Sequence, residues 1–352
     1  MKVISGIQQM GVGATNVHEA WKWYRQNFGM DIRVFEEAAI AQLMLPHTEG
    51  KPRERHAVLT INMQGGGGFE VWQHTGKTPE LPKFEIKLGD LGIFITKLKC
   101  KDVHAAFAQY KLKGLNLLSQ SVLTDPKGNP HFFVKDPYNN IFQIVSSDAW
   151  FKKENCLTGG VYGCIIGVSN IDKSLKVYSD ILGYDQVVYD SNGNFNDFEN
   201  LAGGKNEFRR ILLRHSQPRK GGFSRLLGPS EIELVQVKDR TPESIFKDRI
   251  WGDPGFIHLC FDIIGMKDLR TECVSKGFPF TVDSSESFDM GEAAGHFSYI
   301  ADPDGVLIEF VETHKVPVLK KIGWYFNLKG RNPEKPLSDW MVKTLAFNRV
   351  KD

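Results

Sequence analysis

The chain is poor in cysteine and has no Cys-x-x-Cys pair of the kind that binds zinc or forms a redox dithiol. Its 5 cysteines are odd in number and widely spaced, which argues against a disulfide framework. Cysteine packs well as a small hydrophobic residue, so we interpret these side chains as buried free thiols. A protein in a reducing compartment fits this usage.

The chain also lacks long apolar runs and an excess of charge of either sign. No apolar run approaches the ~18 residues of a membrane helix, and the first residues show no pattern of a secretory signal. The 44 Lys and Arg nearly balance the 42 Asp and Glu, giving a net charge of +2. Neither nucleic acid nor a membrane is therefore expected as a partner. We expect a cytoplasmic protein, monomer or homodimer, that binds a small molecule.

The main feature of the sequence is a pattern of strand, helix and further strands that occurs four times. Each repeat begins with a short apolar strand that leads into an amphipathic helix ending at glycine, and it closes with strands. The spacing from Gln9 to Gly29 is 20 positions, as it is from Gly163 to Gly183. In the second and fourth repeats it is 19 positions, from Ile95 to Gly114 and from His258 to Gly277. The sequence therefore predicts four strand-helix-strand modules in an alternating order.

Each module has one position in its first strand and one in its last strand that can point inward. In module order these positions are Gln9 and Glu70, Ile95 and Gln143, Gly163 and Glu233, and His258 and Glu309. Only the first and last modules carry metal-binding side chains at both positions, because isoleucine and glycine side chains offer no ligand atom. The sequence predicts one metal site assembled from the two ends of the chain.

At 352 residues the chain is long enough for about two domains. We predict a first domain over residues 1–150 (modules one and two), a second over 158–315 (modules three and four) and a C-terminal tail over 316–352. The tail is rich in Trp and Phe and should dock on the domains rather than stay in solvent. Helices are expected over residues 17–27, 102–113 and 171–182, with Asn16 or Thr15 as the first cap, and over 337–346 in the tail.

These motifs resemble the vicinal oxygen chelate superfamily, which includes glyoxalase I, extradiol dioxygenases and bleomycin-binding proteins. The most specific segments are Gln8–Met10, Phe69–Trp72, Ile257–Phe261 and Asp302–Phe310. The resemblance implies an α+β fold of four βαβββ modules paired into two vicinal-oxygen-chelate domains around a divalent metal. In single-chain glyoxalases of this kind, module one pairs with module four and module two with module three, which would bring the four outer ligands together.

The predicted ligand set is one amide, one imidazole and two carboxylates. Such a set suits one divalent ion among Zn²⁺, Ni²⁺, Co²⁺, Mn²⁺ and Fe²⁺, and it leaves positions open for water or substrate. By similarity to glyoxalase I, Gln9 and His258 hold the ion. Glu309 is the first choice for moving a proton and Glu70 acts on the opposite side, while both also bind the metal. The implied chemistry is a lyase or isomerase reaction through a metal-chelated enediolate.

Ordinary alternatives exist for several of these residues. Taken alone, Gln9 could be an ordinary polar residue of a strand, and Glu70 and Glu309 could be outward-facing residues of half-buried strands. Gln143 and Glu233 have the same local sequence pattern but face Ile95 and Gly163, so a vestigial site without a catalytic metal is expected there. The run Gly65–Gly68 is interpreted as a hairpin turn. His296 could be a proton donor in the pocket or a hydrogen-bonded strand histidine.

The substrate shell differs from glyoxalase I. That enzyme has arginine, asparagine and arginine where this sequence has Gly13, His74 and Pro254, so glutathione specificity is not expected. Two other functions stay open. One is a non-haem Fe(II) dioxygenase that cleaves a hydroquinone or catechol, although Gln9 stands where such enzymes have their first histidine. The other is a metal-free small-molecule binding protein.

Overall fold

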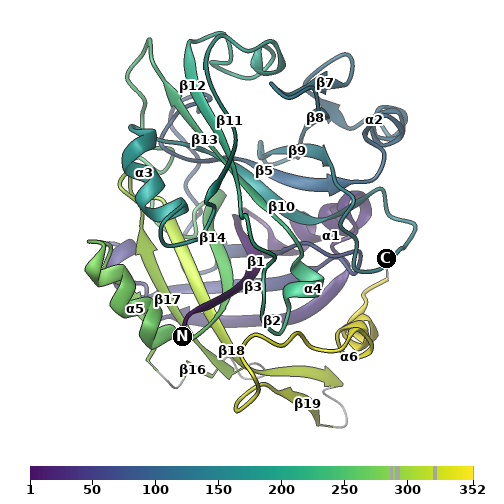
Figure 1. The fold of residues 1–352 in the computed structure, drawn as a ribbon, viewed down its shortest axis with the longest axis vertical. Coiled ribbons are helices and arrows are strands. Elements are labelled where there is room, and N and C mark those ends of the chain that lie inside the picture. The colour runs from purple at the N-terminus through teal and green to yellow at the C-terminus, as the bar shows by residue number, and fades with distance from the viewer. Residues whose placement is uncertain (286–287, 290–293, 320–322, 352) are drawn as a thin grey trace.

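The computed structural model describes residues 1–285, 288–289, 294–319 and 323–351, and the strands form two mixed sheets. The first sheet lies in the lower part of Figure 1 and has the order β15-β17-β18-β14-β1-β4-β3-β2, with β16 on β17 and β19 on β18. Its strands are β1 (Val3–Gly13), β2 (Ile32–Ala41), β3 (Arg53–Ile61), β4 (Gly68–His74), β14 (Gly255–Ile264), β15 (Val282–Asp283), β16 (Phe288–Asp289), β17 (Ala294–Ala301), β18 (Leu307–Leu319) and β19 (Trp324–Asn327).

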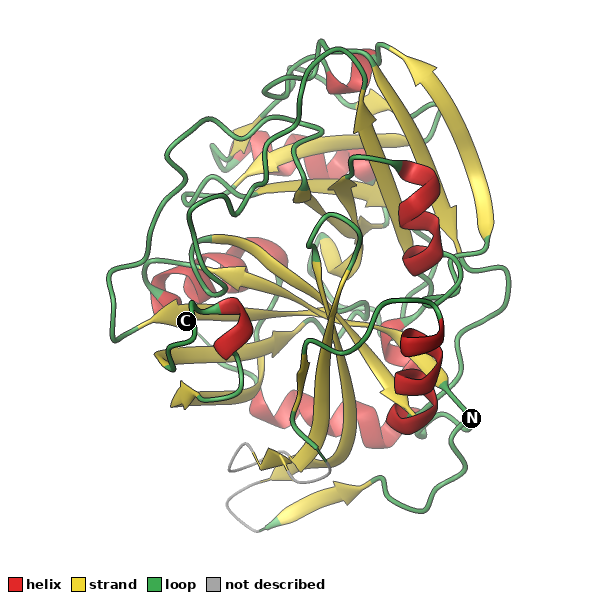
Figure 2. Ribbon diagram, turned by 90° about the vertical axis from the view of Figure 1, so that its left-hand side faces the viewer, coloured by secondary structure: helices red, strands yellow, loops and turns green. Residues whose placement is uncertain are grey.

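The second sheet lies above the first in the same view and has the order β11-β12-β13-β10-β5-β9-β8-β6, with β7 on β8. Its strands are β5 (Gly92–Cys100), β6 (Asn116–Leu117), β7 (Leu123–Thr124), β8 (Pro130–Lys135), β9 (Ile141–Ser146), β10 (Thr158–Gly167), β11 (Gln186–Gly193), β12 (Phe208–Arg214) and β13 (Glu231–Val237). Figure 2 shows both sheets as yellow strands with red helices packed against them, and α1 (Val17–Phe28) packs against strands of both sheets. The expected α+β fold of vicinal-oxygen-chelate type is confirmed.

Each sheet joins one module from either half of the sequence. Strand β1 of module one pairs antiparallel with β14 of module four, and β5 of module two pairs antiparallel with β10 of module three. The pairing of module one with four and of two with three, implied by the resemblance, is therefore confirmed. The sheets cut across the ranges 1–150 and 158–315 because the first strand of each module hydrogen-bonds to a strand from the other half.

The longer helices are α1 (Val17–Phe28), α2 (Val103–Leu112), α3 (Ile171–Tyr178) and α5 (Met266–Ser275). In α1 the Asn16 side chain accepts hydrogen bonds from the backbone N–H groups of His18 and Glu19, so the predicted cap is confirmed. Helix α3 ends four residues earlier than the expected 182. Just after Tyr178, the backbone N–H of Asp180 donates to the carbonyl of Leu175 at 3.1 Å, five residues back, so the regular α-helical pattern is interrupted there.

Paired helices and turns connect the modules within each half of the sequence. Tyr24 of α1 donates a hydrogen bond to Asp136 in the Asp-Pro turn of module two at 2.6 Å. Tyr178 of α3 donates to Asp302, in the matching turn of module four, at 2.9 Å. All four side chains are buried, and burial is the largest cause of the raised pKa of both tyrosines. The repeat seen in the sequence is thus also a repeat of buried contacts.

The glycine-rich run is a hairpin turn between β3 and β4, as expected, and it also joins the two sheets. The backbone groups of Gly67 and Val161 exchange hydrogen bonds at 2.9 and 2.7 Å, and the N–H of Gly66 donates to Leu226. Gly66 has a φ of 102°, and a Cβ there would lie 2.7 Å from the carbonyl carbon of Gly160. Glycine is needed at this position both for the turn and for the close approach of the sheets.

The tail packs against strands β2 and β18 of the first sheet. It forms β19, helix α6 (Asp339–Lys343) and a 3₁₀ turn (Thr344–Asn348), so the helix expected over 337–346 is shorter and changes type at its end. Leu337, Val342 and Leu345 are buried with Ile32 and Ile61 in one apolar cluster. None of the helices in the described ranges is long and apolar enough to span a membrane.

Candidate metal centre

The four predicted ligands meet on four neighbouring strands of the first sheet. The Nε2 atom of His258 (β14) lies 3.1 Å from Oε2 of Glu309 (β18) and 3.4 Å from Oε2 of Glu70 (β4). The side-chain amide of Gln9 (β1) donates to Oε2 of Glu309 at 3.4 Å. One ligand atom from each of Glu70, His258 and Glu309 lies within 4.8 Å of the others. The structure therefore brings together the residues that the repeat singled out.

Strand register explains why these side chains converge. Gly11 of β1 pairs with His258 on one side and with Glu70 on the other, and Cys260 pairs with Glu309. Alternate residues of a strand point to the same face, so all of the ligand side chains point to one face of the sheet. Gly11 leaves the space for the imidazole, because a Cβ at this position would lie 2.4 Å from its Cε1 atom.

The site is buried and its polar atoms are incompletely paired. His258 is fully buried, and Gln9, Glu70 and Glu309 are each less than 9% exposed. Oε1 of Gln9 and Nδ1 of His258 have no hydrogen-bond partner among the described residues, and Nε2 of His258 lies near the two carboxylates without the geometry of a hydrogen bond. Buried polar atoms are normally paired, so unpaired ones that face each other need an explanation. Amide oxygen, imidazole nitrogen and carboxylate oxygen are all metal ligands, and a divalent ion fits this arrangement.

The electrostatics of the site favour a positive charge. Burial alone would lower the pKa of His258, but the carboxylates of Glu309 and Glu70 outweigh it and raise this pKa to about 9. Burial, together with the negative charge of Glu309, raises the pKa of Tyr299 well above its usual value. Two carboxylates in a dry site thus attract a cation at the point where the four side chains meet.

Three of the four candidate ligands, Gln9, Glu70 and Glu309, border a cavity of about 470 Å³. Most of its lining is apolar or aromatic, with Phe35, Leu59, Trp72 and Phe297 among its walls. The cavity is completed by residues from outside modules one and four, because Phe223 and Leu226 of the loop and short helix before β13 and Leu345 of the tail also line it. Pockets of this size hold small organic ligands, and the apolar walls favour a ligand with an apolar body.

Arg55 of β3 is a cavity residue that the sequence analysis missed. Its guanidinium binds Glu37 at 2.6 Å and lies 5.0 Å from the Trp72 ring, while its Nε atom has no hydrogen-bond partner among the residues described. A signal existed in the sequence. Leu59 pairs with Glu70 across the β3–β4 ladder, so counting back in steps of two along β3 places Arg55 on the face of the metal ligands.

The other singled-out histidines take different positions. His296 lines the cavity, and its Nε2 atom lies 2.5 Å from a carboxylate oxygen of Asp283, so it is both a pocket residue and a hydrogen-bonded strand histidine. His74 is buried away from the cavity lining with Nε2 at 3.1 Å from the carbonyl of Trp251. At Gly13, a Cβ would lie 2.1 Å from the carbonyl oxygen of Asp253, which excludes a larger side chain in this packing.

In the second sheet, Glu233 is bound by cationic side chains of the protein itself. Lys97 donates to both Glu233 and Glu231 at 2.8 Å, and Arg210 and Tyr189 donate to the other oxygen of Glu233. Burial alone would raise the pKa of Glu233, but Arg210 and Lys97 lower it to about 2. Gln143, the other candidate of this sheet, is buried and pairs in register with Lys97.

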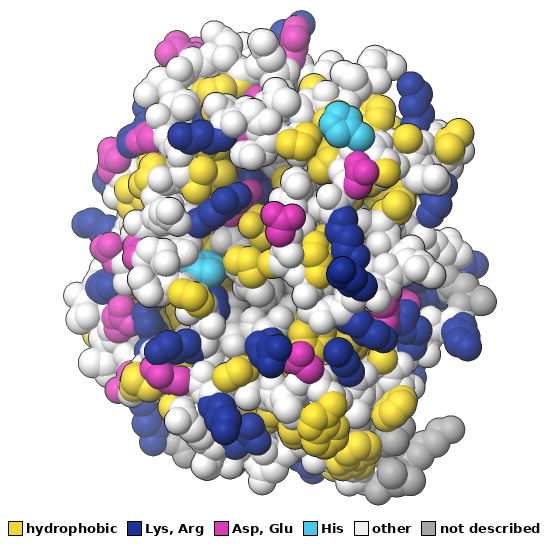
Figure 3. Space-filling model, turned by 45° about the vertical axis from the view of Figure 1, so that its right-hand side comes forward, with side chains coloured by type: hydrophobic (Ala, Val, Ile, Leu, Met, Phe, Trp, Pro, Cys, Tyr) yellow, Lys and Arg dark blue, Asp and Glu magenta, His cyan; other side chains and the backbone are white. Residues whose placement is uncertain are grey.

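On the face of the molecule in Figure 3, basic and acidic side chains are interspersed with small groups of hydrophobic ones. This distribution agrees with the net charge of +2, since no broad area of a single charge is visible on this face. Charge on this face therefore gives no indication of a nucleic-acid or membrane partner.

Comparisons with known proteins agree with this architecture. Residues 162–310 match the model of the Glyoxalase/Bleomycin resistance protein/Dioxygenase superfamily. Glyoxalase I from Zea mays has a similar structure, with a TM-score of 0.53, 12% identity and coverage of 89% of this chain and 92% of that chain. A proposed dioxygenase from Bacillus subtilis has a TM-score of 0.56 with 13% identity and coverage of 89% and 86%. No curated protein sequence matches the chain. At these identities the structural similarity establishes the fold.

Proposed function

We propose that this chain, whose residues 162–310 match the Glyoxalase/Bleomycin resistance protein/Dioxygenase superfamily, is a divalent-metal-dependent lyase or isomerase of the glyoxalase I type. One observation carries the proposal. Gln9, Glu70, His258 and Glu309 converge in a buried site, with incompletely paired ligand atoms, at the wall of an apolar cavity. Burying two carboxylates and an imidazole without full hydrogen bonding lowers the stability of the fold. Such groups are typical of binding and catalytic sites, where their function explains why they are kept.

The four side chains would hold one ion among Zn²⁺, Ni²⁺, Co²⁺, Mn²⁺ and Fe²⁺. When bound, such an ion supplies a Lewis acid that stabilises the negative charge of an enediolate. Glu309, which borders the cavity, removes the proton from the carbon that bears the substrate hydroxyl. The electron pair of that C–H bond forms the carbon–carbon double bond of the enediolate while the carbonyl π electrons move onto the carbonyl oxygen. The proton is then returned to the neighbouring carbon and the hydroxyl proton passes to the former carbonyl oxygen, so that hydroxyl and carbonyl exchange places. Glu70 borders the cavity as well and faces the substrate from β4, the other side of His258.

The cavity indicates the kind of substrate. A small oxygenated head would lie against the ligands while an apolar or aromatic body fills the space between Trp72, Phe35 and Phe297. The unpaired Nε of Arg55 can donate a hydrogen bond to an oxygen of the substrate. Gly13 and Pro254 offer no cation for glutathione, so we propose a 2-hydroxycarbonyl substrate that does not depend on this thiol.

Dioxygenase activity is the competing function, and one observation favours it. The aromatic cavity wall would also accept a hydroquinone or catechol ring. Gln9 argues against it, because the iron site of ring-cleaving enzymes uses two histidines and one carboxylate. A metal-free binding protein would use the cavity without the ligand set.

The test begins with protein stripped of metal by chelation and reconstituted with each of the five ions. Isomerisation is measured on hemithioacetals of phenylglyoxal formed with glutathione and with 2-mercaptoethanol, and oxygen uptake is measured on hydroquinones. We expect metal-dependent isomerisation of both hemithioacetals. Glu309→Gln keeps an oxygen ligand but removes the base, so kcat should fall roughly 10²–10⁴-fold with metal retained. Glu85→Gln, at an exposed position, is the control and should be neutral.

Two results would contradict the proposal. Oxygen uptake with a hydroquinone, together with no isomerisation by any reconstituted form, would assign the chain to the dioxygenases. Failure to bind any of the ions, with ligand binding unaffected by His258→Ala, would leave only the binding protein.

A further inference from the structure

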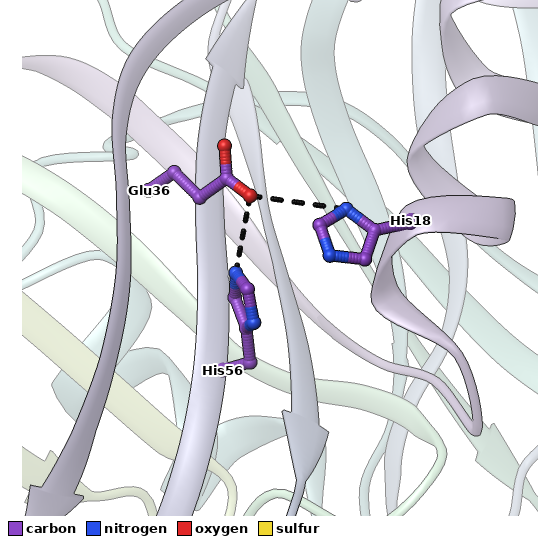
Figure 4. Close-up of side chains that lie close together, drawn as sticks. All are labelled: His18, Glu36 and His56. Carbon is purple, nitrogen blue, oxygen red and sulfur yellow. Dashed lines mark hydrogen bonds and ion pairs between the residues drawn. The ribbon is translucent and has the colours of Figure 1, made fainter.

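A second group of ligand-type side chains lies outside the cavity, where the start of α1 passes over β2 and β3. Figure 4 shows the rings of His18 and His56 directed at the same carboxylate oxygen of Glu36. Oε1 of Glu36 lies 3.2 Å from Nε2 of His56 and 3.8 Å from Nδ1 of His18. One ligand atom from each of the three residues lies within 4.8 Å of the others. His18, Glu36 and His56 form an outer triad.

The secondary structure fixes this arrangement. In the β2–β3 ladder Glu36 pairs with Val58 and Ala38 pairs with His56, so Glu36 and His56 are diagonal neighbours on one face. The cap at Asn16 sets the start of α1 and places His18 in its first turn, above the two strands. The His18 and His56 rings meet edge to face with centroids 4.9 Å apart. Two strands and a helix therefore each supply one member.

The outer triad lies on the opposite face of β3 from the candidate metal centre. Thr60 is on the helix side, where it accepts a hydrogen bond from the Trp21 indole of α1, and His56 shares its face because it is four residues away. Leu59 and Arg55 are each one position removed from these residues along β3, so their side chains point to the opposite face, where they line the cavity. The two groups of ligands are thus separated by the thickness of the sheet.

The spacing of the outer triad suits a tetrahedral ion. Zinc bonds of roughly 2.0–2.2 Å to nitrogen and oxygen require ligand atoms to be about 3.3–3.5 Å apart. The observed 3.2 and 3.8 Å lie on either side of this range. Arg33 donates to the other carboxylate oxygen of Glu36 at 2.6 Å and so leaves Oε1 for the ion. His18 is exposed, so the fourth coordination position is open to water.

Charge at Glu36 is consistent with binding a cation. Burial alone would raise the pKa of the Glu36 carboxyl, but the hydrogen bond and charge of Arg33, followed by His56 and His18, lower it. The carboxylate is therefore ionised at neutral pH and carries negative charge toward the two imidazole rings. Two neutral imidazoles and one carboxylate form a frequent ligand set for zinc.

We propose that His18, Glu36 and His56 form a second site, for Zn²⁺, at the surface of the protein. An ion there would join the first turn of α1 to β2 and β3. Because β3 carries cavity residues on its other face, the site would also brace one wall of the cavity. The ion takes no part in the proposed reaction, and the outer site does not depend on that function.

The chain offers a matched control for this site. His104 follows the N-cap Asp102 by two positions in α2, as His18 follows Asn16 in α1, and it is also exposed. His104 is not part of a metal-ligand group among the described residues. His104→Ala therefore removes an equivalent helix histidine without touching the outer triad.

The experiment is a titration of chelator-stripped full-length protein with ZnCl₂, followed by equilibrium dialysis and metal analysis. We expect His18→Ala and His56→Ala each to bind one Zn²⁺ fewer than the starting protein, and His104→Ala to bind the same number. Circular dichroism checks that these surface variants are folded. Equal zinc content in the starting protein, His18→Ala and His56→Ala would overturn the proposal.

A second measurement separates the outer site from the candidate metal centre. In a His258→Ala background, ZnCl₂ should still raise the thermal midpoint, and adding His56→Ala should abolish this rise. If zinc has no effect in the His258→Ala background, then the outer triad does not bind it and the proposal is wrong. A zinc ion that is lost on His258→Ala alone belongs to the candidate metal centre and not to the outer triad.

Discussion

Replacing Gly11 with alanine tests the geometry of the candidate metal centre without removing any ligand. The new Cβ would lie 2.4 Å from Cε1, 2.6 Å from Nδ1 and 2.7 Å from Nε2 of His258. Carbon atoms in contact prefer about 3.5–4.0 Å, so the ring must move by roughly 1 Å or more. It has little room, because His258 is fully buried with Tyr299 beside it at a centroid distance of 5.6 Å.

The expected effect follows from this displacement. Overpacking a buried site costs about 1–3 kcal/mol of the free energy of unfolding, which urea titration can measure. A ligand turned away from its neighbours should weaken metal binding roughly 10–100-fold, measured by competition with a chromophoric chelator. If the proposed activity is present, a misplacement of about 1 Å should lower it on the order of 10²-fold.

Gly222→Ala is the control, because a Cβ at this position would have its nearest neighbours at 3.8 and 3.9 Å in the side chain of Leu337. It should leave both the metal affinity and the free energy of unfolding close to those of the starting protein. If Gly11→Ala behaves in the same way as Gly222→Ala, then the His258 ring does not lie against Gly11. The described arrangement of the four ligands would then be wrong.

Three further predictions concern parts of the molecule outside the first metal site. Lys97→Met should lower the free energy of unfolding by roughly 3–5 kcal/mol at neutral pH, because two buried carboxylates lose a shared cation. Glu233 stabilises the fold above its unfolded pKa near 4.5, and this contribution disappears as the pH falls toward its folded pKa of about 2. In Lys97→Met the acid unfolding midpoint should therefore move to higher pH, and an unchanged midpoint would contradict the ion pair. Burial lowers the pKa of Lys99 from 10.5 to about 7, so between these values the unfolded chain binds more protons and the free energy of unfolding should rise with pH. Lys99→Met should remove this rise in urea titrations at pH 7.5 to 10, and a persistent slope would assign it to another group. Asn16→Ala removes the cap of α1 and should cost about 1 kcal/mol in the same assay, whereas no loss would mean that solvent replaces the cap.

The candidate ligands of the proposed metal centre could be identified in the sequence because they occur at repeating positions. A strand exposes alternate residues on one face, and the spacing between strand and helix-ending glycine locates the inward position in each module. Gln9, Glu70, His258 and Glu309 could therefore be identified one module at a time. Which modules share a sheet could not be read in this way, because all four first strands are apolar and alternate alike. That pairing came from the resemblance to known glyoxalases.

The cavity wall and the outer triad could not be predicted, since both depend on contacts between distant segments. Leu345 reaches the cavity only because the tail folds back across the sheet. His18 and Glu36 are ordinary polar residues in the sequence until the ladder between β2 and β3 and the docking of α1 bring them together. The position of Arg55 could be predicted in part. Once Leu59 is known to pair with the inward-facing Glu70, alternation along β3 places Arg55 on the same face.

The fixed ammonium group of Lys97 gives the two sheets different dependences on their surroundings. A covalently attached charge is present at every concentration of free ion, and chelating agents cannot extract it. The carboxylate of Glu233 therefore needs no bound ion as its counter-charge, whereas at the proposed centre in the other sheet a bound ion would supply positive charge beside Glu70 and Glu309.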